Sequence, residues 1–232
     1  MRQCWETITF LHWHYPIDVV QAVLPPDFEV EPWDGAAWVG LLPFSMRVSP
    51  PIGPPIPFVT TFPETNVRTY VRGPDGQPGI WFFSLDAANI PAVAAGRIGY
   101  GLPYFPARMR VRRHDGTVEY SSHRLALNGH RPGHDIVVAP HERIAENKVD
   151  AFDLYLTARF LLWTTHRGWI RSIPAVHRPW PLRRARLDRL TENLVESAGL
   201  PAPGSAPIVH YSDGVDVRLG RSRRHRLLDG SN

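Results

Sequence analysis

The chain has 232 residues, of which 43% are hydrophobic, and it carries a net charge of +4 with a pI near 9.6. This length supports one sizeable core, and a composition with eight tryptophans excludes an intrinsically disordered chain. No apolar run is long enough to cross a membrane, and the amino-terminal region lacks the apolar centre of a secretion signal. We therefore expect a cytoplasmic protein with no membrane partner.

The basic residues do not form a recognisable nucleic-acid-binding motif. They are almost all arginines, and they gather in two runs, residues 183–189 and 221–226. Neither run belongs to a known reading motif, so we expect no nucleic-acid partner. The second run lies in residues 221–232, which we predict to be a flexible basic tail after a single domain of residues 1–220.

The first half of the chain alternates strand patterns with turn signals. Residues 50–63 are rich in proline, which predicts an extended loop packed over a sheet. Helical spacing begins at Pro16 and ends before Pro25, and a second helix is predicted at Pro91–Tyr100. Runs rich in β-branched and aromatic residues predict strands at Cys4–Tyr15, Ala37–Val48, Thr65–Arg72 and Ile80–Asp86.

The second half contains two predicted hairpins and two predicted helices. Turn dipeptides at Asp115–Gly116 and Arg167–Gly168 separate pairs of strand patterns. The hairpin strands are Arg108–His114 with Thr117–Leu125, and Phe160–Thr165 with Trp169–Val176. The helices are Asp150–Phe160 and Leu187–Ala198, and the last strands lie at Ile208–Leu219. Many antiparallel strands with few helices predict an α+β fold around a closed or strongly curved sheet.

The stretch Ala92–Phe105 reads AVAAGRIGYGLPYF. It resembles the signature of the acetoacetate decarboxylase superfamily, which runs roughly A-x-A-A-G-R-E-x-x-G-x-P-K-K. In that signature the first lysine forms a Schiff base with the substrate, and the second lysine lowers the pKa of the first. Tyr104 and Phe105 occupy the two lysine positions here. The matching positions are Gly96, Arg97, Gly101 and Pro103.

The loss of both lysines removes the imine mechanism. A Schiff-base lysine must be neutral to attack a carbonyl group, and tyrosine has no amine at all. The single lysine of the chain, Lys148, ends the polar run Glu142–Lys148, which predicts a solvated side chain. We therefore expect no imine with acetoacetate.

The resemblance covers nearly the whole chain and is strongest to the uncharacterised YqjF-like family (domain of unknown function 2071) of that superfamily. It implies a mainly antiparallel β-cone or barrel with a few peripheral helices and a central pocket. The family has no established reaction. The further segments that carry the resemblance are Leu11–Pro26, Phe62–Arg72, Trp81–Asp86, Arg178–Leu182 and Val209–Arg218.

Glu64 is the first candidate for the site. Alternation along a strand places Glu64, Asn66 and Arg68 on one face, which either lines the interior or is simply solvated. The match of Glu64 to a family glutamate favours a general acid or base, with Asn66 and Arg68 as substrate contacts. We expect Arg68 or Arg97 to contact Glu64 and to keep its carboxylate ionised.

Tyr104 and Arg97 each have two interpretations. The Tyr104 hydroxyl either hydrogen-bonds a ligand carbonyl, as a catalytic group, or its ring fills the space of the missing lysine. Arg97 either binds a ligand carboxylate or ties its helix to Asp86 or Glu64. The resemblance predicts that Glu64 and Tyr104 face one cavity.

The histidine pairs do not complete a metal site. His12 and His14 share a face of the first strand, an arrangement that can hold a metal, but no third ligand lies near them in the sequence. His130 and His134 lie in a predicted loop. We therefore predict no metal and no other cofactor, and His12 remains a candidate substrate contact.

Three functions are compatible with these residues. The protein is an enzyme of lyase or isomerase type acting on a small oxo-acid or enol without imine formation, a small-molecule-binding protein, or a structural protein. An open pocket lined by Glu64, Tyr104 and an arginine favours the first two, whereas an interior filled by Trp and Phe favours the third. Homo-oligomerisation stays open.

Overall fold

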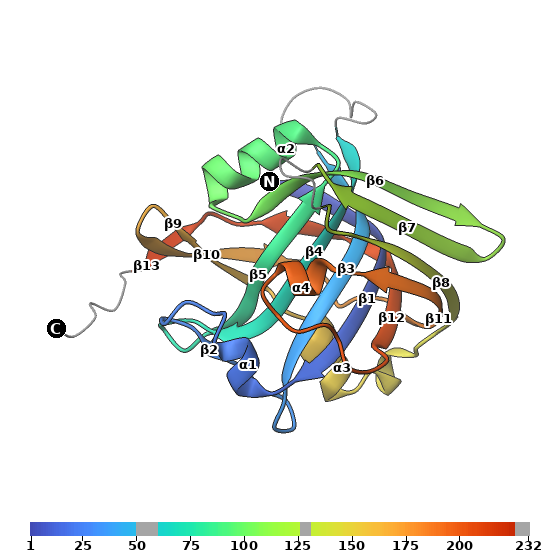
Figure 1. Ribbon diagram of the computed structural model, residues 1–232, viewed down its shortest axis with the longest axis horizontal. Helices are drawn as coiled ribbons and strands as arrows, with labels where there is room; N and C mark the ends of the chain where they lie inside the picture. Colours follow the sequence, from blue (N-terminus) through green and yellow to red (C-terminus); the bar gives the residue numbers. More distant parts are fainter. Residues whose placement is uncertain (50–59, 126–130, 226–232) are drawn as a thin grey trace.

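The computed structural model describes residues 1–49, 60–125 and 131–225 (Figure 1). The predicted proline-rich loop therefore lies largely outside the described residues, as does His130. No helix in these three ranges is both long and apolar enough to cross a membrane.

Strands dominate the described chain, and the helices are short. The helices are α1 (Ile17–Gln21), α2 (Ile90–Ala95), α3 (Ala151–Thr157) and α4 (Leu194–Ser197), with a π-helical turn η1 (Gly96–Tyr100) and a 3-10 turn η2 (Glu146–Lys148). The strands are β1 (Arg2–Tyr15), β2 (Glu29–Val30), β3 (Ala37–Val48), β4 (Thr61–Arg72), β5 (Pro78–Ala87), β6 (Tyr104–His114), β7 (Thr117–Arg124), β8 (Gly133–Arg143), β9 (Leu161–His166), β10 (Trp169–Val176), β11 (Leu182–Glu192), β12 (Ile208–Leu219) and β13 (Arg223–His225).

All of these strands belong to one sheet. Its order includes β5-β6-β7-β8-β11-β12-β1-β3-β4, and β4 also pairs with β5, so the pairing returns to the strand from which it started. The pairs are antiparallel except for β5 with β6 and β5 with β9. Figure 1 shows α2 across one end of the sheet and α1 and α3 at the opposite end. The predicted mostly β fold with few helices is confirmed.

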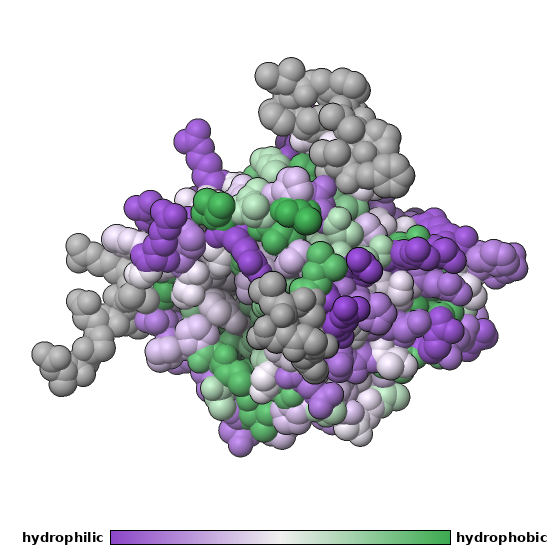
Figure 2. All heavy atoms as spheres, turned by 45° about the horizontal axis from the view of Figure 1, so that its top comes forward, coloured by the Kyte–Doolittle hydropathy of each residue, from purple (hydrophilic) through white to green (hydrophobic). Residues whose placement is uncertain are grey.

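The end that carries α2 exposes hydrophobic side chains. Ile90 is 65% exposed and Ile98 is 69% exposed, and both belong to the continuous segment of α2 and η1. Figure 2 shows hydrophobic residues gathered on this face of the molecule.

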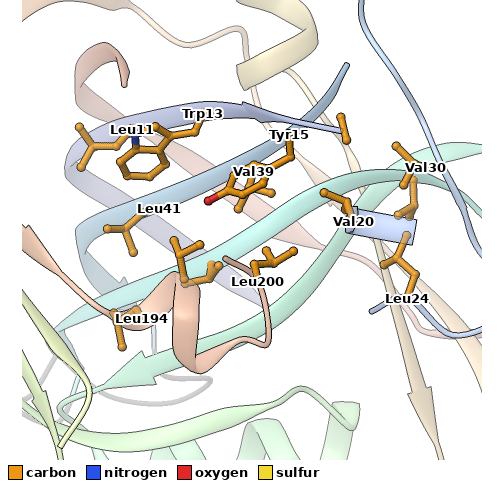
Figure 3. Close-up of a cluster of buried hydrophobic side chains, with 14 of the residues drawn as sticks. Leu11, Trp13, Tyr15, Val20, Leu24, Val30, Val39, Leu41, Leu194 and Leu200 are labelled. Atoms are coloured by element: carbon orange, nitrogen blue, oxygen red, sulfur yellow. The ribbon is translucent and has the colours of Figure 1, made fainter. Parts of the chain in front are cut away.

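Both faces of the sheet are buried at its centre. Adjacent residues of β3 point to opposite sides, so Leu41 packs in one hydrophobic cluster and Leu42 in another. The first cluster lies under α1 and α4, and Figure 3 shows it with Trp13, Val20 and Leu194. The second cluster surrounds the interior cavity described below. The sheet therefore has an inner face on which buried polar side chains can meet.

The predicted helix Leu187–Ala198 is wrong, because β11 extends to Glu192 and α4 is a single short turn. The pairing of β11 with β8 shifts register between Leu187 and Arg189. This bulge changes the spacing of inward-facing residues from two to three, so that Leu187 and Leu190 imitate helical spacing.

Two other expectations need correction. His134 is not in a loop: it lies in β8, is buried, and its Nε2 is 2.8 Å from the Thr65 hydroxyl. The basic tail is not wholly irregular, because β13 pairs with β10 and His225 Nε2 lies 2.8 Å from the Ser172 hydroxyl. Backbone pairing with a strand edge does not need an apolar pattern, which is why no sequence pattern predicted β13.

A buried ion pair joins β5 to the end of β7. Arg124 Nε lies 2.9 Å from Asp86 Oδ1, and the Asp86 side chain has no exposed surface. The predicted link of Asp86 to Arg97 is therefore wrong. Burial raises the pKa of Asp86 to about 6, and Arg124 opposes that rise, so the pair is charged at neutral pH.

We predict that Asp86→Ala strongly destabilises the fold. The change leaves the Arg124 charge buried without a partner, which costs about 3–5 kcal/mol of unfolding free energy. Chemical denaturation measures this loss. Asp188→Ala is the matched control, because it breaks the exposed Asp188–Arg186 pair and should change stability little. Equal effects of the two substitutions would contradict the importance of the buried pair.

Candidate functional site

Strand β4 carries three polar residues on the inner face of the sheet. Glu64 is 2% exposed, and Asn66 and Arg68 are each 5% exposed. All three line one interior cavity, whereas the intervening Val67 packs in the first hydrophobic cluster. The predicted alternation is therefore confirmed, and the alternative of a solvated face is wrong.

Tyr104 is positioned by the turn that precedes β6. Gly101 adopts a left-handed conformation with φ of 71° at the end of η1, which reverses the chain into β6. Gly96 gives the tyrosine ring its space, because a Cβ there would lie 2.4 Å from Tyr104 Cδ2. The Tyr104 hydroxyl then donates to Glu64 Oε2 over 3.0 Å. The two residues meet at one cavity, as the resemblance implied.

No arginine pairs with Glu64 among the described residues, so the expectation of an ionised carboxylate is wrong. Arg68 Nη2 donates instead to the Leu156 carbonyl over 3.0 Å. Arg97 is exposed, and its Nε donates to the backbone carbonyl of Tyr104 over 2.6 Å. Arg97 thus ties η1 to β6, and the structure does not bring its guanidinium to the cavity.

Glu64 is consequently protonated at neutral pH. Burial raises the pKa of its carboxyl to about 8, the Tyr104 hydrogen bond opposes this rise, and the Asp86 charge adds to it. Burial also raises the pKa of Tyr104 well above its usual value. The pair therefore consists of two neutral groups that can each hydrogen-bond an oxygen atom.

Two neighbouring cavities, here called lobes, share this pair in their walls. The arginine lobe, about 50 Å³, contains Arg68 and Arg159 among aromatic and aliphatic walls. The apolar lobe, about 170 Å³, lies under α2 and η1. The residues that line both lobes are Gln3, Met46, Glu64, Leu102, Tyr104, Leu162 and Leu219.

Unsatisfied polar atoms cluster in the arginine lobe. The Nε atoms of Arg68 and Arg159 and the Oδ1 atom of Asn66 are buried and have no hydrogen-bond partner among the described residues. Buried polar atoms in native proteins are nearly always paired, so these atoms can accommodate the polar groups of a ligand. Two guanidinium donors favour an anionic group there.

Arg159 and His177 are site residues that the sequence analysis missed. Arg159 follows α3, and Glu31 holds its Nη2 at 3.0 Å. His177 lines the arginine lobe, and its Nδ1 donates to the Arg178 carbonyl, so Nε2 is the free acceptor. Burial lowers the pKa of His177, which keeps it neutral. His177 directly precedes the segment Arg178–Leu182, whose resemblance to the family could have pointed to it. No sequence pattern pointed to Arg159.

His12 does not line either lobe, which corrects its expected role as a ligand contact. It is completely buried, with its Nε2 2.7 Å from the Tyr70 hydroxyl, and this hydroxyl donates to the Leu156 carbonyl. His14, by contrast, is exposed. Within the described ranges, no three His, Cys, Asp or Glu side chains gather as a metal site.

Comparisons with known proteins agree on family and fold. The family model DUF2071, described as an uncharacterized conserved protein, matches residues 2–216. The uncharacterized protein YqjF of Bacillus subtilis (strain 168) is 34% identical over 218 residues, 94% of this chain and 89% of that protein.

Two solved structures show the likeness of fold. Acetoacetate decarboxylase from Legionella pneumophila has a TM-score of 0.66 at 14% identity, covering 97% of this chain and 86% of its own. The enduracididine biosynthesis enzyme MppR, complexed with pyruvate, has a TM-score of 0.64 at 13% identity, covering 96% of this chain and 89% of its own.

The raised pKa of Glu64 predicts a specific dependence of stability on pH. The carboxyl has a pKa of about 8 in the native state and 4.5 when unfolded. Its contribution to the free energy of unfolding is therefore complete below pH 4.5 and is lost as the pH rises from 4.5 through 8. Glu64→Gln preserves a neutral group that accepts the Tyr104 hydrogen bond. The wild type should therefore lose roughly 4 kcal/mol relative to this variant between pH 4.5 and 8.

Urea denaturation at several pH values measures the difference between the two proteins. The shift of His134, which is not among the groups that perturb Glu64, is common to both proteins and cancels in this difference. Parallel pH profiles would show that Glu64 has an ordinary pKa.

Proposed function

The chain belongs to the DUF2071 family, and we propose that it binds a small oxo-acid or enol-type metabolite in the two-lobed cavity and promotes its enolisation without an imine. The observation that carries this proposal is the neutral Glu64 carboxyl, hydrogen-bonded to Tyr104 on the cavity wall. The return of the strand pairing from β4 to β5 supports the β-cone that would enclose this cavity.

The ligand carboxylate binds in the arginine lobe. The free Nε–H groups of Arg68 and Arg159 are the donors available to it, and burial strengthens such charge-assisted hydrogen bonds. Glu31 fixes Arg159 from the far side, and the Leu156 carbonyl fixes Arg68. Both guanidinium groups are therefore held in place before the ligand arrives.

Proton transfer then follows from the protonation states. Glu64 donates its proton to the ligand carbonyl oxygen, and the Tyr104 hydroxyl, which donates to Glu64 Oε2, stabilises the carboxylate that this transfer leaves. His177 Nε2 accepts a proton from the carbon next to the carbonyl. The C–H electron pair becomes the carbon–carbon double bond, and the carbonyl oxygen becomes the enol hydroxyl. In the reverse direction His177 returns a proton to the same carbon and the enol hydroxyl returns its proton to Glu64, which regenerates both neutral groups.

The positions of the two missing lysines support a mechanism without an imine. Tyr104 supplies a hydroxyl. The Phe105 ring lies under the Arg124 guanidinium, whose Cζ atom is 3.9 Å from the centroid of the ring. Lys148 is exposed in η2 and does not line the cavity. The pyruvate complex of MppR supports the ligand class, because pyruvate is a 2-oxo acid bound on the same fold.

Hydrogen exchange tests the proposed enolisation. In D₂O, the wild type should accelerate deuterium incorporation at C3 of pyruvate and 2-oxobutanoate, as followed by proton NMR. Glu64→Gln should slow this exchange at least about 100-fold, because general acid catalysis typically contributes that much. Tyr104→Phe should slow it less, and Lys148→Arg is the control that keeps it unchanged. Binding of these acids without exchange would identify a non-catalytic binding protein instead.

Borohydride trapping tests the absence of an imine. With acetoacetate and borohydride, the mass of the protein should stay unchanged, because the cavity holds no lysine. Intact-protein mass spectrometry reports the result, and the Lys148→Arg variant is the matched control. A stable adduct on Lys148 would contradict the proposed mechanism.

A further inference from the structure

The apolar lobe has a structure that a two- or three-carbon ligand does not explain. Its walls come from α2 and η1 and from residues of β1, β3, β4, β6, β9, β10 and β12. The residues that belong to this lobe alone are Met1, Val48, Phe62, Ala92, Ala95, Gly96, Tyr100 and Ile173. Among the described residues that line it, Glu64, at the junction, is the one carboxyl, and none is an arginine or a lysine.

The volume of the lobe fits a hydrocarbon group. It measures about 170 Å³, and a cavity of roughly 150 Å³ with apolar walls takes up benzene. A group of about six carbon atoms therefore fits. Pyruvate, whose carboxylate would occupy the arginine lobe, has a single methyl group to extend into this space.

The lobe continues to an apolar surface. Met1 and Ala95 line it and are also exposed. The same α2–η1 segment carries the exposed Ile90 and Ile98. An apolar route thus runs from this surface to Glu64 and Tyr104, and the arginines lie beyond that pair.

We propose that the natural ligand is an oxo-acid with a hydrocarbon tail of about four to six carbons, whose tail occupies the apolar lobe. This inference rests on the proposed function, because the carboxylate in the arginine lobe fixes the direction of the molecule. The oxo group lies at Glu64 and Tyr104, and the tail extends under α2 and η1. Ala92 and Ala95 then set the tail length, because their small side chains leave the lobe open.

A chain-length series tests the proposal. Calorimetry measures the dissociation constants of straight-chain 2-oxo acids from pyruvate to 2-oxooctanoate. Each added methylene should tighten binding about two- to fourfold until the lobe is filled, since it is transferred from water to an apolar wall. Equal affinity for all members of the series would overturn the proposal while leaving acid binding intact.

Two alanines of one helix provide a matched pair of variants. Ala92→Leu places a larger side chain in the lobe, whereas Ala94→Leu places it on the exposed side of α2, outside both lobes. Ala92→Leu should leave pyruvate binding unchanged and remove the gain from longer tails. Ala94→Leu should bind the whole series as the wild type does. Thermal melting confirms that both variants fold, and equal behaviour of the two would also overturn the proposal.

A neutral series separates this proposal from the proposed function. Straight-chain 2-alkanones carry the tail and the oxo group but lack the carboxylate. One outcome is that no acid binds, while the alkanones still show a length dependence that Ala92→Leu removes. This result would support tail binding in the apolar lobe and contradict carboxylate binding in the arginine lobe. If neither series binds, both proposals are overturned.

Discussion

The site depends on a carboxylic acid that is buried without a cation. Such a group has to be either paired with a positive charge or protonated, because an isolated carboxylate is strongly disfavoured away from water. The two arginines that reach the cavity are held by other acceptors, Arg68 by the Leu156 carbonyl and Arg159 by Glu31. Tyr104 supplies a neutral donor to Glu64. Glu64 is protonated because the arginines bind other acceptors and its own partner, Tyr104, is neutral.

This constraint links the missing lysines to the state of Glu64. A lysine at position 104 would place an ammonium group near the carboxyl and would favour its ionised form. Tyrosine at that position removes the nucleophile and also removes the cation. At the neighbouring position, Phe105 lies under the Arg124 guanidinium, whose charge is balanced by Asp86. With aromatic residues at these two positions, the polar centre of this cavity is a neutral acid and not an amine.

The sequence predicted the local elements well where turns and alternation agree, as in β3 and in the hairpin at Asp115–Gly116. It also brought Glu64 and Tyr104 together, but only through the family resemblance, since 40 residues separate them. The expected contact of Arg68 with Glu64 was wrong. Alternation along the strand predicts the face on which the Arg68 side chain lies, but not that this long side chain extends to the Leu156 carbonyl. Arg159 and His177 reach the cavity from distant segments, and the bulge in β11 imitated a helix. These features depend on tertiary contacts that no local pattern contains.

A protonated Glu64 is also what the proposed binding of an anion beside it requires. An ionised carboxylate at the junction of the lobes would repel a ligand carboxylate across a medium of low dielectric constant, where such repulsion is strong. The neutral acid instead offers a hydrogen, and the arginines beyond it offer positive charge. Because binding and protonation are linked, an anion bound in the arginine lobe raises the pKa of Glu64 further. In the proposed function, the ligand would thereby stabilise the protonated form of Glu64 that proton donation to its oxo group requires.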